Sequence, residues 1–257
     1  ASHRLKMGVG LPSFREWWAR MTPEQLQFGS DREALERLVP LRARRIVHVG
    51  CGDGALSVAL AKRGASVLGV DVDPERARKN RDLGSMQGVT LVEGFAQNLP
   101  QNDGTVDAVI MLNFLSRVEA YDMDDCLAEA CRVLKEFNGL LFVGDYDTSG
   151  PYDDMVRMFH DQSAERAWAL DALLRMPQDV FVSAREIHYG LKRQFPDFDS
   201  FVAGVLAVYD TGLTVEDINN EHVRALFEQG RTGNYFEFEQ ARRVNLYLTG
   251  NVAPAGT

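Results

Sequence analysis

The stretch RIVHVGCGDG, residues 45–54, decides how this chain folds. Three of its first five residues are β-branched, which is typical of a strand. Gly50, Gly52 and Gly54 follow, and residues 55–63 are mostly helix formers. Glycines let the backbone turn sharply and approach a ligand, and the free N–H groups where a helix begins can receive a polar group. The stretch therefore predicts a strand, a ligand-binding turn and a helix.

An acidic residue ends the next apolar run. Residues 66–71 form this second predicted strand, and Asp71 stands 21 residues beyond Gly50 (71 minus 50). A carboxylate at this place can accept hydrogen bonds from both hydroxyls of a ribose. A helix is expected to open at Asp73, an N-cap candidate followed by Pro74. Together these features predict a site for a nucleoside-type cofactor.

Three more short, continuous apolar runs are predicted to be strands, at residues 89–92, 106–112 and 140–143. Such runs are typical of strands buried on both faces, in a parallel sheet covered by helices. Cys126 and Cys131 fall on a helix before the last of them and are expected to pack in the core.

The flanks of this unit are predicted to be mainly helical. Phe14, Trp17 and Trp18 have helical spacing, a second helix starts after Ser30, and residues 151–230 are expected to be mostly helix. Alternation at residues 235–239 and 244–248 predicts two late, antiparallel strands.

The expected fold is α/β, a doubly wound and mostly parallel sheet with N-terminal helices and a mainly helical insertion before the last strands. We expect one domain over 1–257. It divides into a helical lid at 1–40, which Phe14–Trp18 help to place over the cofactor, a cofactor-binding core at 41–150 and an acceptor-side region at 151–257.

Composition excludes several classes of protein. A net charge of −9 and a pI near 5.1 disfavour nucleic-acid binding, which relies on Lys and Arg to neutralise phosphates. Apolar runs long enough to span a membrane are lacking. The three cysteines have neither CxxC nor Cys/His metal spacing, so we expect no disulfide framework, no metal and a cytoplasmic setting.

Several segments resemble the class I S-adenosylmethionine-dependent methyltransferases, small-molecule type. The segment HVGCGDG, residues 48–54, looks like the family's first motif, and VDVDP, residues 70–74, looks like the second. Further resemblance follows in family order over residues 94–100, 106–115 and 127–142. It covers roughly residues 40–145 and implies the Rossmann-like fold described above.

The resemblance also implies a site for S-adenosylmethionine. In the family the glycine loop holds the methionine part of this cofactor, the acid after the second strand holds the ribose, and the segment after the third strand holds adenine. Carried over, the cofactor-binding residues are His48, Gly50, Cys51, Gly52, Gly54, Asp71, Val72, Phe95 and Ala96. Asn113 is added because it lies just past the carboxyl end of the fourth predicted strand, where ligands of open α/β sheets bind. His48 and Phe95 stand where the family often has acids, and His48 also fits a core histidine.

The implied function is methyl transfer to a small-molecule acceptor through an N, O or S nucleophile. Two alternatives stay open. Gly50, Gly52 and Ala55 also fit the dinucleotide fingerprint of an NAD-dependent oxidoreductase. A noncatalytic methyltransferase-like binding protein is the other alternative.

The loop after the fifth predicted strand is the candidate acceptor site. Residues 145–154 carry four aspartates and two tyrosines, and His160 follows. An acidic and aromatic rim would attract a cationic or amine-bearing acceptor, and Tyr146 or His160 would take its proton as a catalytic base. A solvated loop with a helix cap is the alternative interpretation.

Overall fold

A computed structural model describes residues 13–19, 28–73, 75, 87–208 and 212–250. The strands are β1 (Arg45–Val49), β2 (Ser66–Asp71), β3 (Val89–Glu93), β4 (Ala108–Leu112), β5 (Leu140–Tyr146), β6 (Phe181–Phe195), β7 (Arg231–Thr232) and β8 (Tyr235–Thr249). The α-helices are α1 (Phe14–Ala19), α2 (Asp31–Leu38), α3 (Ala55–Lys62), α5 (Met123–Val133), α6 (Pro151–Val156), α7 (Ser163–Arg175), α8 (Phe198–Val208), α9 (Val215–Ile218) and α10 (Glu221–Glu228). Two short 3-10 helices are η2 (Leu115–Arg117) and η3 (Gln178–Val180).

One sheet organises the molecule, in the order β3-β2-β1-β4-β5-β8-β6, with β7 paired to β8. The first five strands of this order are parallel, and β8 and β6 are antiparallel additions. The predicted doubly wound, mostly parallel sheet is therefore confirmed. The helix expected after Asp73 lies outside the described residues, although Asp73 Oδ1 accepts the N–H of Glu75 at 2.9 Å.

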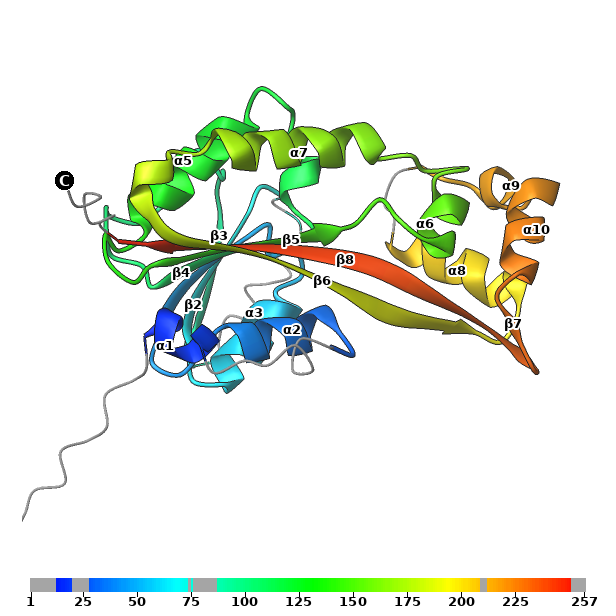
Figure 1. Cartoon of the computed structure of the whole chain (residues 1–257), viewed down its shortest axis with the longest axis horizontal. Helices are drawn as coiled ribbons and strands as arrows, with labels where there is room; N and C mark the ends of the chain where they lie inside the picture. Colours follow the sequence, from blue (N-terminus) through cyan, green and yellow to red (C-terminus); the bar gives the residue numbers. More distant parts are fainter. Residues whose placement is uncertain (1–12, 20–27, 74, 76–86, 209–211, 251–257) are drawn as a thin grey trace, which may run out of the picture.

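Helices cover both faces of the sheet (Figure 1): α1, α2 and α3 lie on one side, and α5 and α7 on the other. Successive strand residues point to opposite faces, so each strand supplies both layers. Ile46 joins the core beneath α2 and α3, whereas Val47 joins the core beneath α5 and α7. Cys126 is fully buried in this second core and Cys131 is partly buried, as their spacing predicts.

The secondary structure of residues 181–195 and 235–249 differs from the prediction. Tyr235–Thr249 is one continuous strand of 15 residues, not two strands, although its antiparallel pairing is as expected. Its long partner β6 lies within the region predicted to be mainly helical, so that prediction is wrong for Phe181–Phe195. Ile187, Tyr189 and Leu191 are buried at alternate positions, a period of two that identifies the strand.

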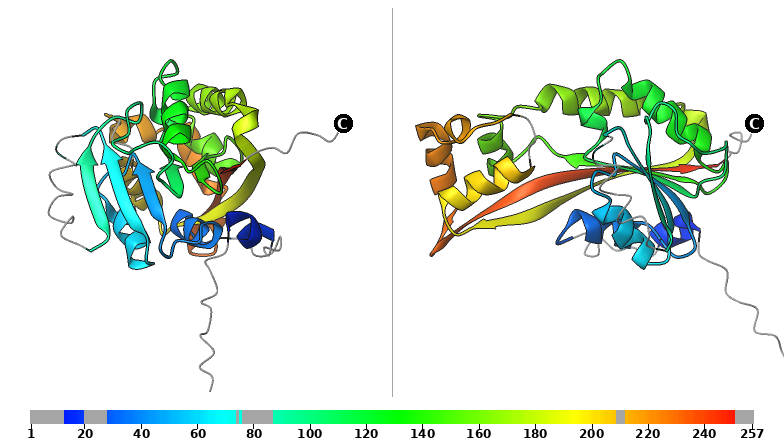
Figure 2. Two further views of the ribbon diagram at one scale, coloured as in Figure 1. Left: turned by 90° about the vertical axis from the view of Figure 1, so that its left-hand side faces the viewer. Right: turned by 180° about the vertical axis from the view of Figure 1, so that it is seen from behind.

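Strands β6 and β8 form a long antiparallel pair, which we call the β6–β8 hairpin although helices α8, α9 and α10 lie between its strands in the sequence. This pair extends past the carboxyl end of β5. Tyr146, the last residue of β5, pairs with Arg242, so residues 235–241 of β8 continue beyond it. Helices α6, α8, α9 and α10 gather at this far end of the hairpin, as both Figure 1 and Figure 2 show. Their apolar side chains form a separate aromatic core around Phe201 and Phe227. We call this part, residues 151–156, 198–208 and 212–238, the helical lobe.

The lid expected from Phe14–Trp18 is wrong for the described part of α1. Phe14 is fully buried, its N–H donates to Asn138 Oδ1 at 3.0 Å, and its ring lies under the guanidinium of Arg44. Arg44 and Asn138 precede β1 and β5, so α1 packs at the amino ends of the strands. The glycine loop lies at the opposite, carboxyl edge, and apolar burial of Phe14 therefore fixes α1 away from it.

Candidate cofactor and acceptor site

The glycine loop follows β1 at the point where the sheet order reverses, with β2 on one side and β4 on the other. Gly50 has a φ of 68°, and a Cβ there would lie 2.3 Å from a ring atom of Phe114. Gly52 has a φ of 54°, but a Cβ there would meet nothing within 4 Å. Gly50 is therefore needed for packing, whereas Gly52 leaves open space above the loop for a ligand.

Asp71 fixes the shape of this loop. Its side chain is buried at the end of β2, and Oδ2 accepts the N–H of Gly52 at 2.8 Å. Oδ1 accepts the N–H of Asp73 at 3.1 Å. Because each carboxylate oxygen has a second lone pair, both can still accept a hydroxyl hydrogen. The residues present therefore fit a ribose beside an open glycine turn.

Two apolar side chains are exposed at the neighbouring strand ends. Val72 follows β2 and is 54% exposed, and Phe95 follows β3 and is 64% exposed. Large exposed apolar groups at a ligand edge suit the faces of a flat base. Ala96 and Cys51 differ, because both side chains are buried in apolar clusters, so only their backbones could contact a ligand.

His48 lies beneath the loop in the core. Its Nδ1 is 2.8 Å from Ser57 Oγ of α3. Burial lowers the pKa of His48 to about 4, against the opposing effect of the Asp71 carboxylate. The imidazole is therefore neutral at ordinary pH and packs as a hydrogen-bonded core group. Asp53, beside the loop, accepts the N–H of Ala55 and helps to begin α3.

Asn113 joins the cofactor edge to the hairpin. It follows β4 with a φ of 52°, a conformation that costs free energy in residues other than glycine and is concentrated at functional sites. Its Oδ1 accepts from Arg242 Nη2 at 2.6 Å, and Arg242 Nε donates to Asp31 Oδ1 at 2.8 Å. The Tyr189 hydroxyl donates to the same Asp31 oxygen at 2.6 Å. Asp31, Tyr189 and Arg242 thus form a polar cluster with Asn113.

Sequence reasoning missed Asp31, Tyr189 and Arg242. The sequence does contain a signal for Arg242. This residue shares its face of β8 with the buried residues Val244, Leu246 and Leu248, so a charged side chain stands where the alternation predicts an apolar one. Tyr189 and Asp31 lie 53 and 211 positions away from it in the chain (242 minus 189 and 242 minus 31). Only the fold shows that they meet.

Tyr146 lies between two arginines. The guanidinium carbon of Arg242 is 4.1 Å from the centre of its ring, and that of Arg166 is 5.4 Å away. A small cavity of about 10 Å³ adjoins Tyr146 and is also bordered by Tyr152, Arg166 and Gln240. His160 is not among the residues that line it. The structure therefore gives Tyr146 a place at the cavity and puts His160 outside its wall.

The sequence predicted an acidic rim at residues 145–154, but most of its aspartates have cationic partners. Asp153 pairs with Arg166 at 2.7 Å, Asp154 pairs with Arg157, and Asp147 lies 2.9 Å from His188. The neighbouring carboxylates raise the pKa of His188, that of Glu186 most. Cationic partners thus oppose the charge of three of the four aspartates, so an attraction for cationic acceptors no longer follows from this loop.

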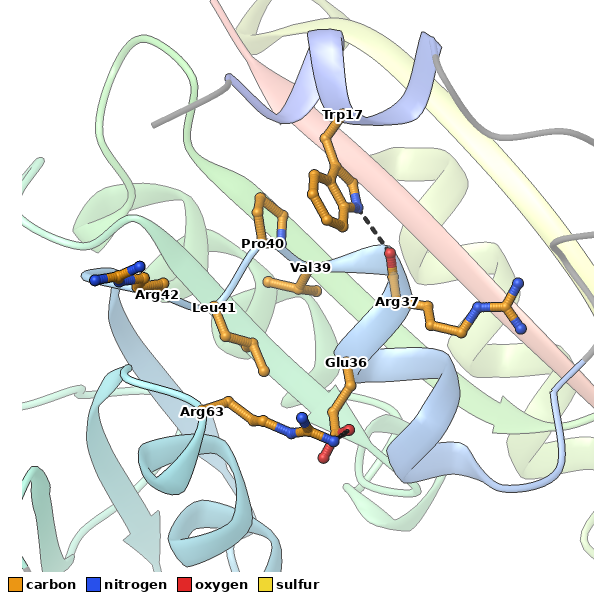
Figure 3. Close-up of a pocket in the computed structure, with 8 residues that line it drawn as sticks. All are labelled: Trp17, Glu36, Arg37, Val39, Pro40, Leu41, Arg42 and Arg63. Carbon is orange, nitrogen blue, oxygen red and sulfur yellow. Dashed lines mark hydrogen bonds and ion pairs between the residues drawn. The ribbon is translucent and has the colours of Figure 1, made fainter. Parts of the chain in front are cut away.

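A hollow larger than the cavity at Tyr146 lies between α1, α2 and the end of α3. It has a volume of about 420 Å³ and is bordered by Trp17, Glu36, Arg37, Val39, Pro40, Leu41, Arg42 and Arg63 (Figure 3). The Trp17 indole donates to the carbonyl of Arg37 at 2.7 Å across it. Apart from Trp17 of α1, these residues lie at the ends of α2 and α3 or just before β1, so the hollow is at the amino edge of the sheet. It is not part of the cofactor site.

The described residues show neither a membrane-spanning helix nor a metal-binding cluster. None of the described helices combines the length and apolar character needed to cross a membrane. Within the described ranges, His, Cys, Asp and Glu side chains form no group of three that could hold a metal.

Comparison with known proteins agrees with this geometry. The profile of a family described as "Methyltransferase domain" matches residues 47–143. The match covers 97 of the 257 residues (143 minus 47, plus 1), from β1 into β5. The resemblance drawn from the sequence is thereby confirmed.

One curated relative is a ubiquinone biosynthesis O-methyltransferase of Xylella fastidiosa, 29% identical over 133 residues, which are 49% of this chain and 53% of that protein. The chain thus matches about half the length of this relative.

Two solved structures share the fold. The YcgJ protein of Bacillus subtilis has a TM-score of 0.55 at 17% identity and covers 82% of this chain and 94% of its own. An S-adenosylmethionine-dependent methyltransferase of Thermotoga maritima has a TM-score of 0.50 at 18% identity and covers 88% of this chain and 90% of its own. At this identity the likeness shows the fold alone.

Proposed function

We propose that the chain binds S-adenosylmethionine and transfers its methyl group to a small-molecule acceptor through an N, O or S nucleophile. One observation carries the proposal: the open turn at Gly52, held by the Asp71 carboxylate at the reversal of the sheet order. The methyltransferase domain at residues 47–143 and its relatives support it.

The residues have distinct roles in this proposal. Gly50, Gly52 and Gly54 shape the loop for the methionine part of the cofactor, with His48 and Cys51 supporting it from the core. Asp71 and Val72 hold the ribose, Phe95 and the backbone of Ala96 hold adenine, and Asn113 marks the methyl end.

Bound S-adenosylmethionine supplies a methyl group on a sulfonium, which an acceptor can displace directly. The protein therefore acts mainly by alignment, and positioning of this kind can contribute roughly 7–11 kcal/mol. Residues 151–257 form the acceptor side in this proposal, because the helical lobe extends beyond the carboxyl ends of the parallel strands. Tyr146, at the edge of that space, is the candidate proton acceptor, in preference to His160.

Calorimetry and a transfer assay test the proposal together. We expect S-adenosylmethionine and S-adenosylhomocysteine to bind and NAD not to bind, since one carboxylate and a short glycine turn fit a single adenosine. Incubation with methyl-labelled cofactor and a metabolite extract should then yield a labelled small molecule. Tighter binding of NAD would indicate an oxidoreductase, and binding without transfer to any acceptor would indicate a noncatalytic protein.

A further inference from the structure

Arg242 has an unusual environment for a charged side chain. It is fully buried, and two of its three guanidinium nitrogens have partners, Nε with Asp31 and Nη2 with Asn113. Nη1 is also buried, but it meets no hydrogen-bond acceptor among the described residues. A buried charged donor without an acceptor is costly, so such an atom marks a place where a ligand can supply the missing oxygen.

A second buried donor lies near the same tyrosine. Arg166 lies over the Tyr146 ring, and its Nε has no acceptor in the described part of the chain. Two carboxylate atoms nearby, Asp145 Oδ2 and Asp153 Oδ2, also lack a hydrogen-bond donor in the described part of the chain. Asp153 Oδ2 lies 3.1 Å from Arg157 Nε, which opposes its charge. The buried guanidinium groups of Arg242 and Arg166 therefore offer hydrogen bonds to a ligand that accepts them.

The position of Arg242 connects this group to the methyl end of the cofactor site. Gly50 packs against Phe114, and Asn113, the residue before Phe114, accepts a hydrogen bond from Arg242. On the other side of Arg242 stands the Tyr146 ring, 4.1 Å away, which faces the small cavity near Arg166. A ligand oxygen at Nη1 would therefore lie between the cofactor edge and the helical lobe.

We propose that the methyl acceptor carries an oxyanion, a carboxylate or a phosphate, which Arg242 binds through Nη1 beside the face of Tyr146. This inference rests on the proposed methyl transfer and names the substrate class for it. It replaces the cationic acceptor expected from the aspartates of residues 145–154. Arg242 is then a specificity-determining residue, because a guanidinium hydrogen bond to a charged oxygen is stronger than one to a neutral oxygen.

The test uses benzoate and benzamide as probes of equal shape but different charge. The full chain is saturated with S-adenosylhomocysteine and titrated with each probe, with the Arg242 side-chain resonances followed by NMR. We expect benzoate to bind roughly tenfold or more tightly than benzamide and to shift those resonances. Inorganic phosphate, the third probe, distinguishes a carboxylate-bearing acceptor from a phosphorylated one. Tighter binding of phosphate than of benzoate would indicate a phosphorylated acceptor, and the reverse would indicate a carboxylate.

A charge-neutral double variant, Asp31→Asn with Arg242→Gln, guards against a folding artefact because neither charge of this ion pair is left without its partner. It should keep its affinity for S-adenosylhomocysteine and bind benzoate and benzamide equally. Arg185→Gln, an exposed arginine on β6, is the matched control and should keep the selectivity of the unchanged chain.

Two results would overturn the inference. They are equal binding of benzoate and benzamide by the unchanged protein, and unaltered selectivity in the double variant. Failure of S-adenosylhomocysteine to bind the unchanged protein would instead contradict the proposed function, and the probe titrations without that ligand still report on the oxyanion site.

Discussion

The proposed cofactor edge and the proposed acceptor edge of this molecule are built in different ways. The cofactor edge uses backbone geometry over residues 45–73, in which glycines and one carboxylate form the turn. The acceptor edge uses side chains from α2, the end of β4, the end of β5 and the β6–β8 hairpin. A site made of local backbone can be identified from a motif, whereas one made of distant side chains becomes visible only when the chain is folded.

This difference predicts that the helical lobe supports the acceptor edge alone. Phe227→Ala should lower the free energy of unfolding by about 4 kcal/mol, since Phe227 is buried among the rings of Phe198, Phe201, Phe236 and Phe238. Affinity for S-adenosylhomocysteine should be unchanged, because the lobe core is separate from the sheet cores.

Urea unfolding and calorimetry measure the two quantities. Phe137→Ala is the control, since Phe137 is 55% exposed and its loss should have little effect on stability. If Phe227→Ala weakened cofactor binding as much as it weakened the fold, the two edges would not be independent.

The Asp31–Arg242 ion pair within the acceptor edge gives the next largest effect. Arg242→Gln leaves the Asp31 carboxylate, 19% exposed, without its guanidinium, and should lower the free energy of unfolding by about 3 kcal/mol. Adding Asp31→Asn should recover most of the lost free energy of unfolding, because no unpaired charge remains. Denaturant titrations of the single and double variants measure this coupling, and simple additivity of the two changes would contradict it.

At the cofactor edge, Asp71→Ala should weaken S-adenosylmethionine binding by about 1–3 kcal/mol, since a charged acceptor is lost and the Gly52 N–H loses its partner. Asp71→Asn keeps one acceptor oxygen and should lose less. Calorimetric titration of each variant gives the comparison. An unchanged dissociation constant in Asp71→Ala would remove Asp71 from the site.

The smallest effect concerns pH at the outer face of the hairpin. Glu186 and then Asp147 raise the pKa of His188. Because the folded-state pKa lies above the unfolded value of about 6.5, this contact stabilises the fold fully below that pH. The stabilisation is lost as pH rises through the folded-state pKa. The imidazole is exposed, so we expect about 0.5 kcal/mol.

Imidazole NMR should show a His188 titration midpoint above 6.5. Stability of His188→Gln relative to the unchanged chain should differ at pH 6 and converge at high pH. A midpoint at or below the ordinary value would show that the two carboxylates do not hold this side chain.

Much of the fold could be predicted from sequence because buried parallel strands have a direct signature. The runs at residues 66–71 and 140–143 are continuous and apolar, and each is a strand. The strand at Phe181–Phe195 was not predicted, since its apolar alternation is short, limited to Ile187, Tyr189 and Leu191, and is flanked by polar and charged residues. Phe14 shows a related limit: helical spacing indicates burial but not which edge of the sheet receives the ring.

Within the site, the same contrast decides what was predictable. Gly52 and Asp71 lie in one βαβ unit with fixed spacing, so their contact could be anticipated. The contact of Arg242 with Asn113 spans 129 positions and has no local pattern. The aspartates of residues 145–154 suggested free negative charge because their partners, Arg166 and His188, come from other elements.

Calorimetry of two glycine variants tests the central claim, that the cofactor binds in the open turn at Gly52. Gly52 and Gly233 both have left-handed backbones, with φ of 54° and 64°, and a Cβ at either would meet no atom within 4 Å. Alanine should therefore cost each site a similar backbone strain, about 1 kcal/mol. We predict that Gly52→Ala loses tenfold or more in affinity for S-adenosylhomocysteine, about 1.4 kcal/mol or more, whereas Gly233→Ala keeps it. Equal affinity in the two variants would contradict the account.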